Sequence, residues 1–157
     1  MNSEHKILVD ELKRILLGGN AHVSLKDAVK GLPRELRSVK PPNIPYSIWQ
    51  LIEHMRIAQW DMLQFCKDGN HKSPKWPEEY WPKQNAPKND SAWDESLRQI
   101  DADLDEFIEL IKRADLYQPI QHGAGQNVLL EALQVADHNA YHIGEIITLR
   151  RMMGDWK

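Results

Sequence analysis

The spacing of apolar residues along the chain is helical almost throughout. Apolar side chains recur every three or four positions in four long segments, and no segment shows the alternation of a β-strand. The pattern predicts helices over about Ser3–Leu17, from Ser47 to about Lys67, from Asp90 or Ser91 to before Asp115, and over about Asn127–Met153. We therefore expect an all-α fold.

Helix-capping signals stand where several of these segments begin. A Ser followed three positions later by Gln or Asp resembles a capping box, in which side chains bond the first free backbone N–H groups of the helix. Such pairs occur at Ser24–Asp27, Ser47–Gln50 and Ser91–Asp94. The first pair predicts a short additional helix, which Gly31 ends.

The apolar faces indicate how the helices pack. In the third helix the apolar residues repeat at intervals of four and three, which suits a neighbouring antiparallel helix. This seam consists of Trp93, Leu97, Ile100, Leu104, Phe107 and Ile111. The apolar arc of the fourth helix is about 200° wide, so we expect that helix to be the most buried. Residues 1–157 are expected to form a single domain, a four-helix bundle with long crossover connections.

Three connectors separate the long helices, and the last of them runs from Asp115 to Gln126. The first, Pro33–Pro45, is rich in proline, and its Pro41-Pro42 pair is expected to be extended. The second, between Lys67 and Asp90, carries Trp76, Tyr80 and Trp81. A loop of this length in a compact domain is usually functional or disordered, and disordered segments are poor in aromatic residues. The aromatics either pin this loop to the bundle or form a lid over a pocket.

Composition and charge exclude several classes of protein. The 157 residues include one cysteine, Cys66, so no internal disulfide can form, and a reducing compartment fits. The N-terminus has no apolar core of a signal peptide, and no apolar run approaches the length of a membrane span. The net charge of −3 comes without any basic block, so nucleic acid is not an expected partner. We expect a cytoplasmic protein.

Three histidines form the candidate functional site. His138 and His142 are spaced i, i+4, which places both rings on one face of the fourth helix. His54 lies at the edge of the apolar stripe of the second helix, where a side chain faces a crevice. Three His ligands with an open position are typical of a catalytic zinc site, and imidazole also suits nickel and iron. The alternative is a pair of partly buried histidines that bond to backbone groups or to Asp137.

The residues around these histidines resemble those of the DinB/YfiT-like superfamily, which is distinct from the DNA polymerase that shares the DinB name. The resemblance rests on Trp49-Gln-Leu-Ile-Glu-His54 and on His138-Asn-Ala-Tyr-His142-Ile-Gly-Glu145, and it covers essentially the whole chain. It implies that one divalent ion is bound by His54, His138 and His142. Many members have Gln at the position of Glu145, which leaves the role of this acid open.

The resemblance also implies a range of functions. Relatives include thiol-S-transferases and isomerases that use low-molecular-weight thiols, and others resemble metal-dependent hydrolases. We therefore expect a metal-dependent transferase or hydrolase that acts on a small molecule, such as a thiol. The alternative is a non-catalytic metal-binding bundle that serves as a stress-linked binding or assembly module. Similar proteins often pair through bundle faces, so a homodimer is expected.

Four further residues are candidates for a role at or near the site. Glu145 shares a helical face with His138 and His142 and is the candidate general base, with a plain surface acid as the alternative. Asp61 is a candidate partner of the site, although a solvent-facing position is the favoured reading. His122 is either a fourth ligand or, more simply, a solvated loop residue. Cys66 is expected to be packed rather than nucleophilic.

The three-His hypothesis has a consequence for pH. Imidazoles must be neutral to bind a metal ion, so affinity is expected to fall below about pH 6.5.

Overall fold

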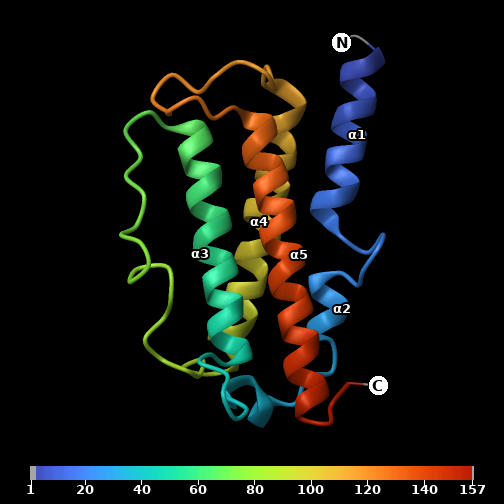
Figure 1. Ribbon diagram of the computed structural model, residues 1–157, viewed down its shortest axis with the longest axis vertical. Coiled ribbons are helices and arrows are strands. Elements are labelled where there is room, and N and C mark those ends of the chain that lie inside the picture. The colour runs from blue at the N-terminus through green and yellow to red at the C-terminus, as the bar shows by residue number, and fades with distance from the viewer. Residues whose placement is uncertain (1–2, 157) are drawn as a thin grey trace.

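The computed structural model describes residues 3–156 and shows an all-α bundle, which confirms the predicted fold class (Figure 1). The described residues contain no strand, only an isolated bridge between Pro119 and Asn127. The elements in chain order are α1 (Ser3–Leu17), α2 (Leu25–Val29), the 3-10 helix η1 (Arg34–Ser38), α3 (Ile48–Lys67), α4 (Asp90–Arg113) and α5 (Val128–Met152).

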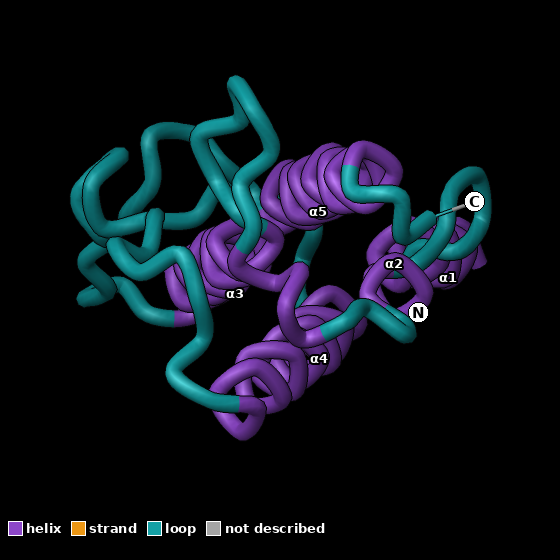
Figure 2. Tube along the Cα trace, turned by 90° about the horizontal axis from the view of Figure 1, so that it is seen from below, coloured by secondary structure: helices purple, strands orange, loops and turns teal. Residues whose placement is uncertain are grey.

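The long segment between α3 and α4 is a crossover connection. Figure 1 shows α3 and α4 running in the same direction, with α1 and α5 running the opposite way. Residues 68–89 therefore return along the whole length of the bundle before α4 begins. Both views place this segment on the α3 side of the molecule, away from α1 (Figures 1 and 2).

Side-chain caps fix where the long helices begin. Ser47 and Gln50 form the predicted reciprocal capping box at the start of α3, with both contacts at 3.2 Å. The predicted Ser91–Asp94 box is wrong, because Asn89 caps α4 by accepting a hydrogen bond from the backbone N–H of Ala92 at 2.8 Å. An Asn is as good an N-cap as a Ser, and it stands before the helix rather than inside its first turn.

The proline-rich connector is only partly extended. Arg34–Ser38 forms the 3-10 turn η1 directly after Pro33, which the sequence pattern did not predict. Pro33 has no N–H to donate and a fixed φ, so it suits the position before a tight helical turn.

The interior consists of two apolar clusters, one toward each end of the bundle. One is built mainly around Leu63, Phe107 and Val135, and the other around Met55, Trp93 and Ile146. On α3 and α5, the buried amides of Gln59 and Asn139 lie between the two clusters and bond to each other at 2.8 Å. The Gln59 amide also donates to the backbone carbonyl of Ile100 at 2.7 Å, so this polar layer joins three helices.

The predicted apolar faces are mostly buried, with exceptions at their margins. All six seam residues of α4 are buried or partly buried, and α4 packs against both the parallel α3 and the oppositely directed α1 and α5. Ile7 and Ile15 of α1 and Leu133 of α5 are exposed although they follow the helical period. Among residues 3–156, no helix combines the length and apolar character needed to cross a membrane.

Candidate metal centre

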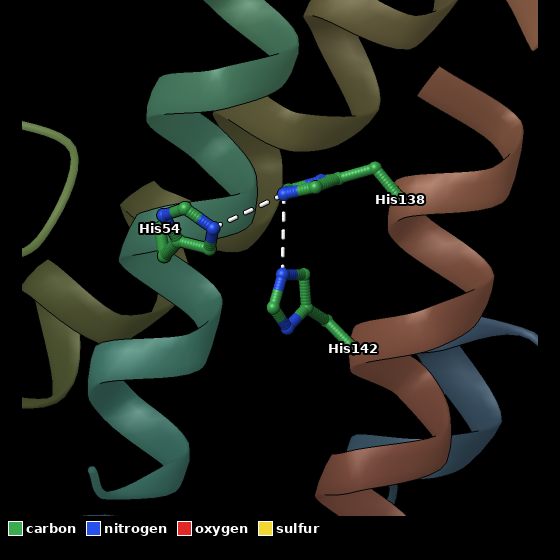
Figure 3. A group of neighbouring side chains, drawn as sticks. All are labelled: His54, His138 and His142. Atoms are coloured by element: carbon green, nitrogen blue, oxygen red, sulfur yellow. Dashed lines mark hydrogen bonds between the residues drawn. The ribbon is translucent and has the colours of Figure 1, made fainter. Parts of the chain in front are cut away.

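Three histidines from two helices converge on one point. Figure 3 shows His54 extending from α3 toward His138 and His142, which extend from α5. The Nε2 atom of His138 lies 3.1 Å from the Nε2 atom of His54 and 3.1 Å from that of His142. One ligand atom from each residue lies within 4.8 Å of the others. The structure thus brings together all three histidines that the sequence singled out.

The helices that carry these rings also bury them. His54 lies near the start of α3 and is 3% exposed, while His142, in the middle of α5, is 5% exposed. His138 is partly buried one turn before His142. The side of the site that faces α3 and α5 is therefore dry, and solvent has access mainly past His138.

Hydrogen bonds at the other ring nitrogens fix which nitrogen faces the centre. His54 Nδ1 lies 3.0 Å from the Tyr80 backbone carbonyl, and His142 Nδ1 lies 2.7 Å from Glu145 Oε2. Both partners are acceptors, so each Nδ1 carries the proton and donates it. The Nε2 atoms of His54 and His142 are then left with free lone pairs, as ligation requires.

The arrangement fits a divalent ion. Ligand nitrogens about 2.1 Å from an ion, at octahedral or tetrahedral angles, lie about 3.0–3.4 Å apart, which matches the two 3.1 Å separations. His138 Nε2 carries at most one proton, but it faces the Nε2 lone pairs of both His54 and His142. It can therefore donate a hydrogen bond to only one of them. A cation at the centre satisfies all three nitrogens at once.

The surroundings keep the three rings neutral. Burial, together with the neighbouring His142 and His54, lowers the pKa of His138 to about 4. Burial also lowers the pKa values of His54 and His142, against the opposing effect of their hydrogen-bond acceptors. Neutral imidazole is the form that binds metal, so the fold holds the ligands in their binding-competent state.

The crossover segment covers the site from outside. The Trp81 ring stacks on His54 with centroids 4.0 Å apart and planes 4° apart, and its other neighbour is Tyr46 at 5.5 Å. The capping residues of α3 hold this segment, because Ser47 Oγ donates to the Asn85 carbonyl at 2.7 Å and Gln50 Nε2 donates to the Pro82 carbonyl at 3.0 Å. The aromatics of the crossover therefore both pin the segment and roof the site.

Glu145 is a hydrogen-bond partner of His142, one of the three candidate ligands. One carboxylate oxygen accepts from His142 Nδ1, and the other accepts a short hydrogen bond from the Tyr46 hydroxyl. Burial and the adjacent Glu145 carboxylate raise the pKa of Tyr46, so its hydroxyl stays protonated as the donor. In this arrangement Glu145 orients His142 and increases the basicity of its ring, rather than standing free beside the site.

Asp61 is buried, so the reading of a solvent-facing position is wrong. Its carboxylate accepts from the Tyr80 hydroxyl at 2.6 Å and contacts His71 Nε2 at 2.7 Å. Because the Tyr80 carbonyl accepts from His54, Asp61 is connected to the site through one intermediate residue. Nothing in the sequence around His71 indicates a partner on α3, so this contact appears only in the structure.

An open cavity of about 540 Å³ adjoins the three histidines. Its walls include Tyr46, Trp76 and Trp81, together with Asp137, Tyr141 and Glu145 of α5. A cavity of this size is in the range of small-molecule sites. Tyr46 and Tyr141 had not been assigned to the site, although Tyr141 lies inside the run that carries the histidine pair.

Two other candidates lie outside the site. His122 is exposed, and its Nε2 contacts the Phe65 backbone carbonyl at 2.7 Å, so it is a loop residue and no fourth ligand. Burial raises the pKa of Cys66 to about 12, which keeps this thiol protonated and agrees with a packing role.

Comparison with known proteins agrees with this geometry. No curated protein matches the chain, and neither does any solved structure. The family profile described as the DinB superfamily matches residues 21–146, which include α2 through most of α5 and all three histidines. With most of its length matched, and with the helical bundle that the structure shows, the chain belongs to the DinB superfamily.

Proposed function

We propose that this protein is a divalent-metal-dependent enzyme of the thiol-S-transferase or hydrolase type, acting on a small molecule such as a thiol. The observation that carries the proposal is the convergence of ring nitrogens from three histidines at the wall of an open cavity. A closed structural site has four protein ligands, whereas three ligands beside a cavity leave a position for a substrate.

The chain's own residues supply the geometry that such a reaction needs. His54, His138 and His142 would hold the ion, and the ion, when bound, supplies Lewis-acid chemistry that lowers the pKa of a coordinated thiol or water. Tyr80 and Glu145 fix the orientation of two ligand rings. Trp81 excludes water from one face of His54.

Zinc is the ion that the ligand set favours by default, and nickel and iron also bind imidazole. We therefore propose one divalent ion per chain, with zinc as the first metal to test.

The first test is metal content. The purified protein, loaded with zinc and then dialysed, is expected to retain about one equivalent of metal. His142→Ala removes a ligand and should lose that metal, while His122→Ala removes an exposed histidine away from the site and should retain it. Equal metal content in the two variants would contradict the three-His site.

The second test is activity. The metal-loaded and metal-free proteins are screened for thiol transfer to electrophiles and for hydrolysis of small esters and amides. An enzyme is expected to show turnover that requires the metal and that His142→Ala abolishes. Full metal binding with no turnover, or full activity in His142→Ala, would instead favour the non-catalytic bundle that acts as a binding or assembly module.

A further inference from the structure

The cavity beside the three histidines carries negative charge and no positive charge. Its lining includes the carboxylates of Asp137 and Glu145, and no Lys or Arg is among its lining residues. Glu145 is engaged by His142 and Tyr46. By contrast, no hydrogen bond or ion pair joins Asp137 to another residue between 3 and 156. Asp137 therefore offers the cavity a carboxylate that no protein group neutralises.

The same cavity is lined by aromatic rings from two different parts of the chain. Trp76, in the crossover segment, is 66% exposed, and Tyr141, on α5, is 64% exposed. Trp81 and Tyr46 continue this aromatic lining toward the histidines. Large aromatic rings that remain exposed at the rim of a cavity leave their faces and edges free for a ligand. Rings combined with carboxylates are the usual surroundings of an organic cation, which ring faces attract through their quadrupole.

A bound divalent ion would add two positive charges to the cavity, and a thiolate head bound to it, together with the Asp137 and Glu145 carboxylates, would offset them. Three neutral imidazoles leave both positive charges of a divalent ion uncompensated, so the ion attracts an anionic or lone-pair group of the ligand. The part of the ligand that extends from the ion into the cavity meets Asp137 and the aromatic rims instead. A second anionic group there would face a carboxylate with no basic residue to pair it.

We propose that the cavity selects a small molecule with two parts: a metal-coordinating head, such as a thiol, and a cationic body that lies between the aromatic rims near Asp137. This inference rests on the proposed function, because it takes the cavity beside the histidines as the substrate pocket. It adds the charge of the substrate, which the three-His site by itself leaves open.

The first arm of the test uses metal-free protein, so that it does not depend on the metal. Isothermal calorimetry compares benzyltrimethylammonium with the anion phenylacetate and the neutral benzyl alcohol. The cation is expected to bind about tenfold more tightly than the anion, a preference that cation–π contacts and one carboxylate can supply. Phenylacetate binding as tightly as the cation would overturn the proposal.

Matched variants locate the preference in the cavity. Asp137→Asn should reduce the preference for the cation about threefold or more, while Asp105→Asn, an exposed acid on α4 away from the cavity, should leave it unchanged. Tyr141→Leu should weaken cation binding, and Tyr117→Leu, equally exposed elsewhere, should not. All four positions are exposed, so these variants are expected to fold. A preference that survives Asp137→Asn unchanged would contradict the assignment.

The second arm uses zinc-loaded protein and three thiols of different charge: the cation thiocholine, the neutral mercaptoethanol and the anion mercaptopropionate. The cationic thiol is expected to bind most tightly and the anionic thiol least tightly, measured by calorimetry. If the protein fails to retain zinc, the proposed function fails while the first arm still decides the charge preference. If zinc is retained and mercaptopropionate binds as tightly as thiocholine, the charge assignment alone fails.

Discussion

In two of the three candidate ligands, a hydrogen-bond acceptor at Nδ1 holds the ring so that Nε2 faces the centre of the site. The Tyr80 carbonyl accepts from His54, and the Glu145 carboxylate accepts from His142. Without these acceptors each ring can turn or change tautomer, and the lone pair no longer points to the centre. Partners of this kind typically contribute about 10–100-fold to metal affinity.

Substitutions of Glu145 test this orienting effect at a single residue. Glu145→Gln keeps a side-chain oxygen that can accept from His142 Nδ1, so we predict that metal content is retained. Glu145→Ala removes the acceptor and should lower metal affinity about 10–100-fold, measured by competition with a chelator. Equal affinity in the parent protein and Glu145→Ala would show that Glu145 does not orient the ligand.

The catalytic role of Glu145 remains a prediction, and turnover decides it. If Glu145 is the general base, Glu145→Gln should lower turnover by about 10²–10⁴-fold while the metal stays bound. The carboxylate has both oxygens engaged by His142 and Tyr46, so it would have to exchange one of these hydrogen bonds to accept a proton. Unchanged turnover in Glu145→Gln would leave it a positioning residue only.

The histidines also predict how the stability of the metal-free protein depends on pH. Burial lowers the pKa of His138 to about 4, below the value near 6.5 of an unfolded chain, and it lowers those of His54 and His142 as well. The unfolded state therefore binds protons first. Stability should be highest above about pH 6.5 and should decrease as pH falls from there toward about 4.

Thermal unfolding in the presence of a chelator measures this dependence. His138→Gln removes one of the three groups and should flatten the decrease, whereas His122→Gln, at an exposed site, should not.

The same lowered pKa values revise the expected pH dependence of metal binding. Protons compete with the metal at the folded-state pKa, so affinity should persist below pH 6.5 and fall toward about pH 4.

At the level of elements, the crossover between α3 and α4 completes the site that two helices begin. Residues 68–89 supply the Tyr80 carbonyl and the Trp81 ring to His54. Asp61 on α3 holds this segment by accepting from the Tyr80 hydroxyl and contacting His71. Burial and the adjacent Asp61 raise the pKa of Tyr80, so the donor stays protonated.

We predict that Asp61→Ala weakens metal binding without unfolding the bundle. Loss of both contacts frees the segment, and the expected reduction in affinity is about tenfold. Tyr80→Phe is the matched variant, because it removes one contact to Asp61 but keeps the backbone carbonyl that His54 requires. Its affinity should lie between those of the parent and Asp61→Ala. Circular dichroism checks that helix content is unchanged, and parent-like affinity in Asp61→Ala would refute the connection.

At the level of the whole molecule, a buried arginine ties the end of α5 to α2. Arg150 Nη1 donates to the Ala28 carbonyl at 2.7 Å and the Lys30 carbonyl at 3.0 Å, and Arg150 Nε donates to Asp155 at 2.7 Å. Its guanidinium also lies over the Trp156 ring, 4.9 Å from the centroid. One side chain therefore satisfies carbonyls about 120 residues away in the sequence.

Arg150→Met should lower the free energy of unfolding by about 3 kcal/mol, because it leaves two carbonyls and a carboxylate without their donor. Arg151→Met changes the exposed neighbour and should have an effect within about 0.5 kcal/mol. Urea unfolding followed by circular dichroism measures both variants. Similar midpoints for the two would show that Arg150 does not stabilise the fold.

Assembly is the second question at this scale. The α4 seam is buried inside the monomer, so it leaves no apolar stripe for a partner. Leu130 and Leu133, one turn apart on α5, are each 44% exposed and provide another apolar surface. We predict a two-fold homodimer through this face of α5. Light scattering should give about twice the 18.3 kDa of the chain.

Leu130→Glu with Leu133→Glu should then produce a monomer, whereas the same change at the exposed Ile7 and Ile15 of α1 should leave the dimer intact. A parent protein that is already monomeric at dilute concentration would reject the dimer.

The periodicity of the chain determined the helices, and the reason is local. Helix formation depends on residues three or four positions apart, so the apolar spacing and the Ser47–Gln50 box predicted α3 and α5 closely. The same spacing placed His138 and His142 on one face. At the start of α4 the local pattern misled, because Asn89 caps the helix two residues before the predicted Ser91.

Only the tertiary structure decided which distant groups meet. The crossover segment has no period, so nothing in its sequence assigned Tyr80 to His54 or His71 to Asp61. The Tyr46–Glu145 contact joins residues 99 positions apart. Such contacts depend on the path that an irregular connector takes across the packed helices. Hydrogen bonds from the helix-capping residues, hydrogen bonds to backbone carbonyls and ring stacking set that path together, and they come from several elements. The candidate ligands were therefore visible in the sequence, whereas the groups that orient them were not.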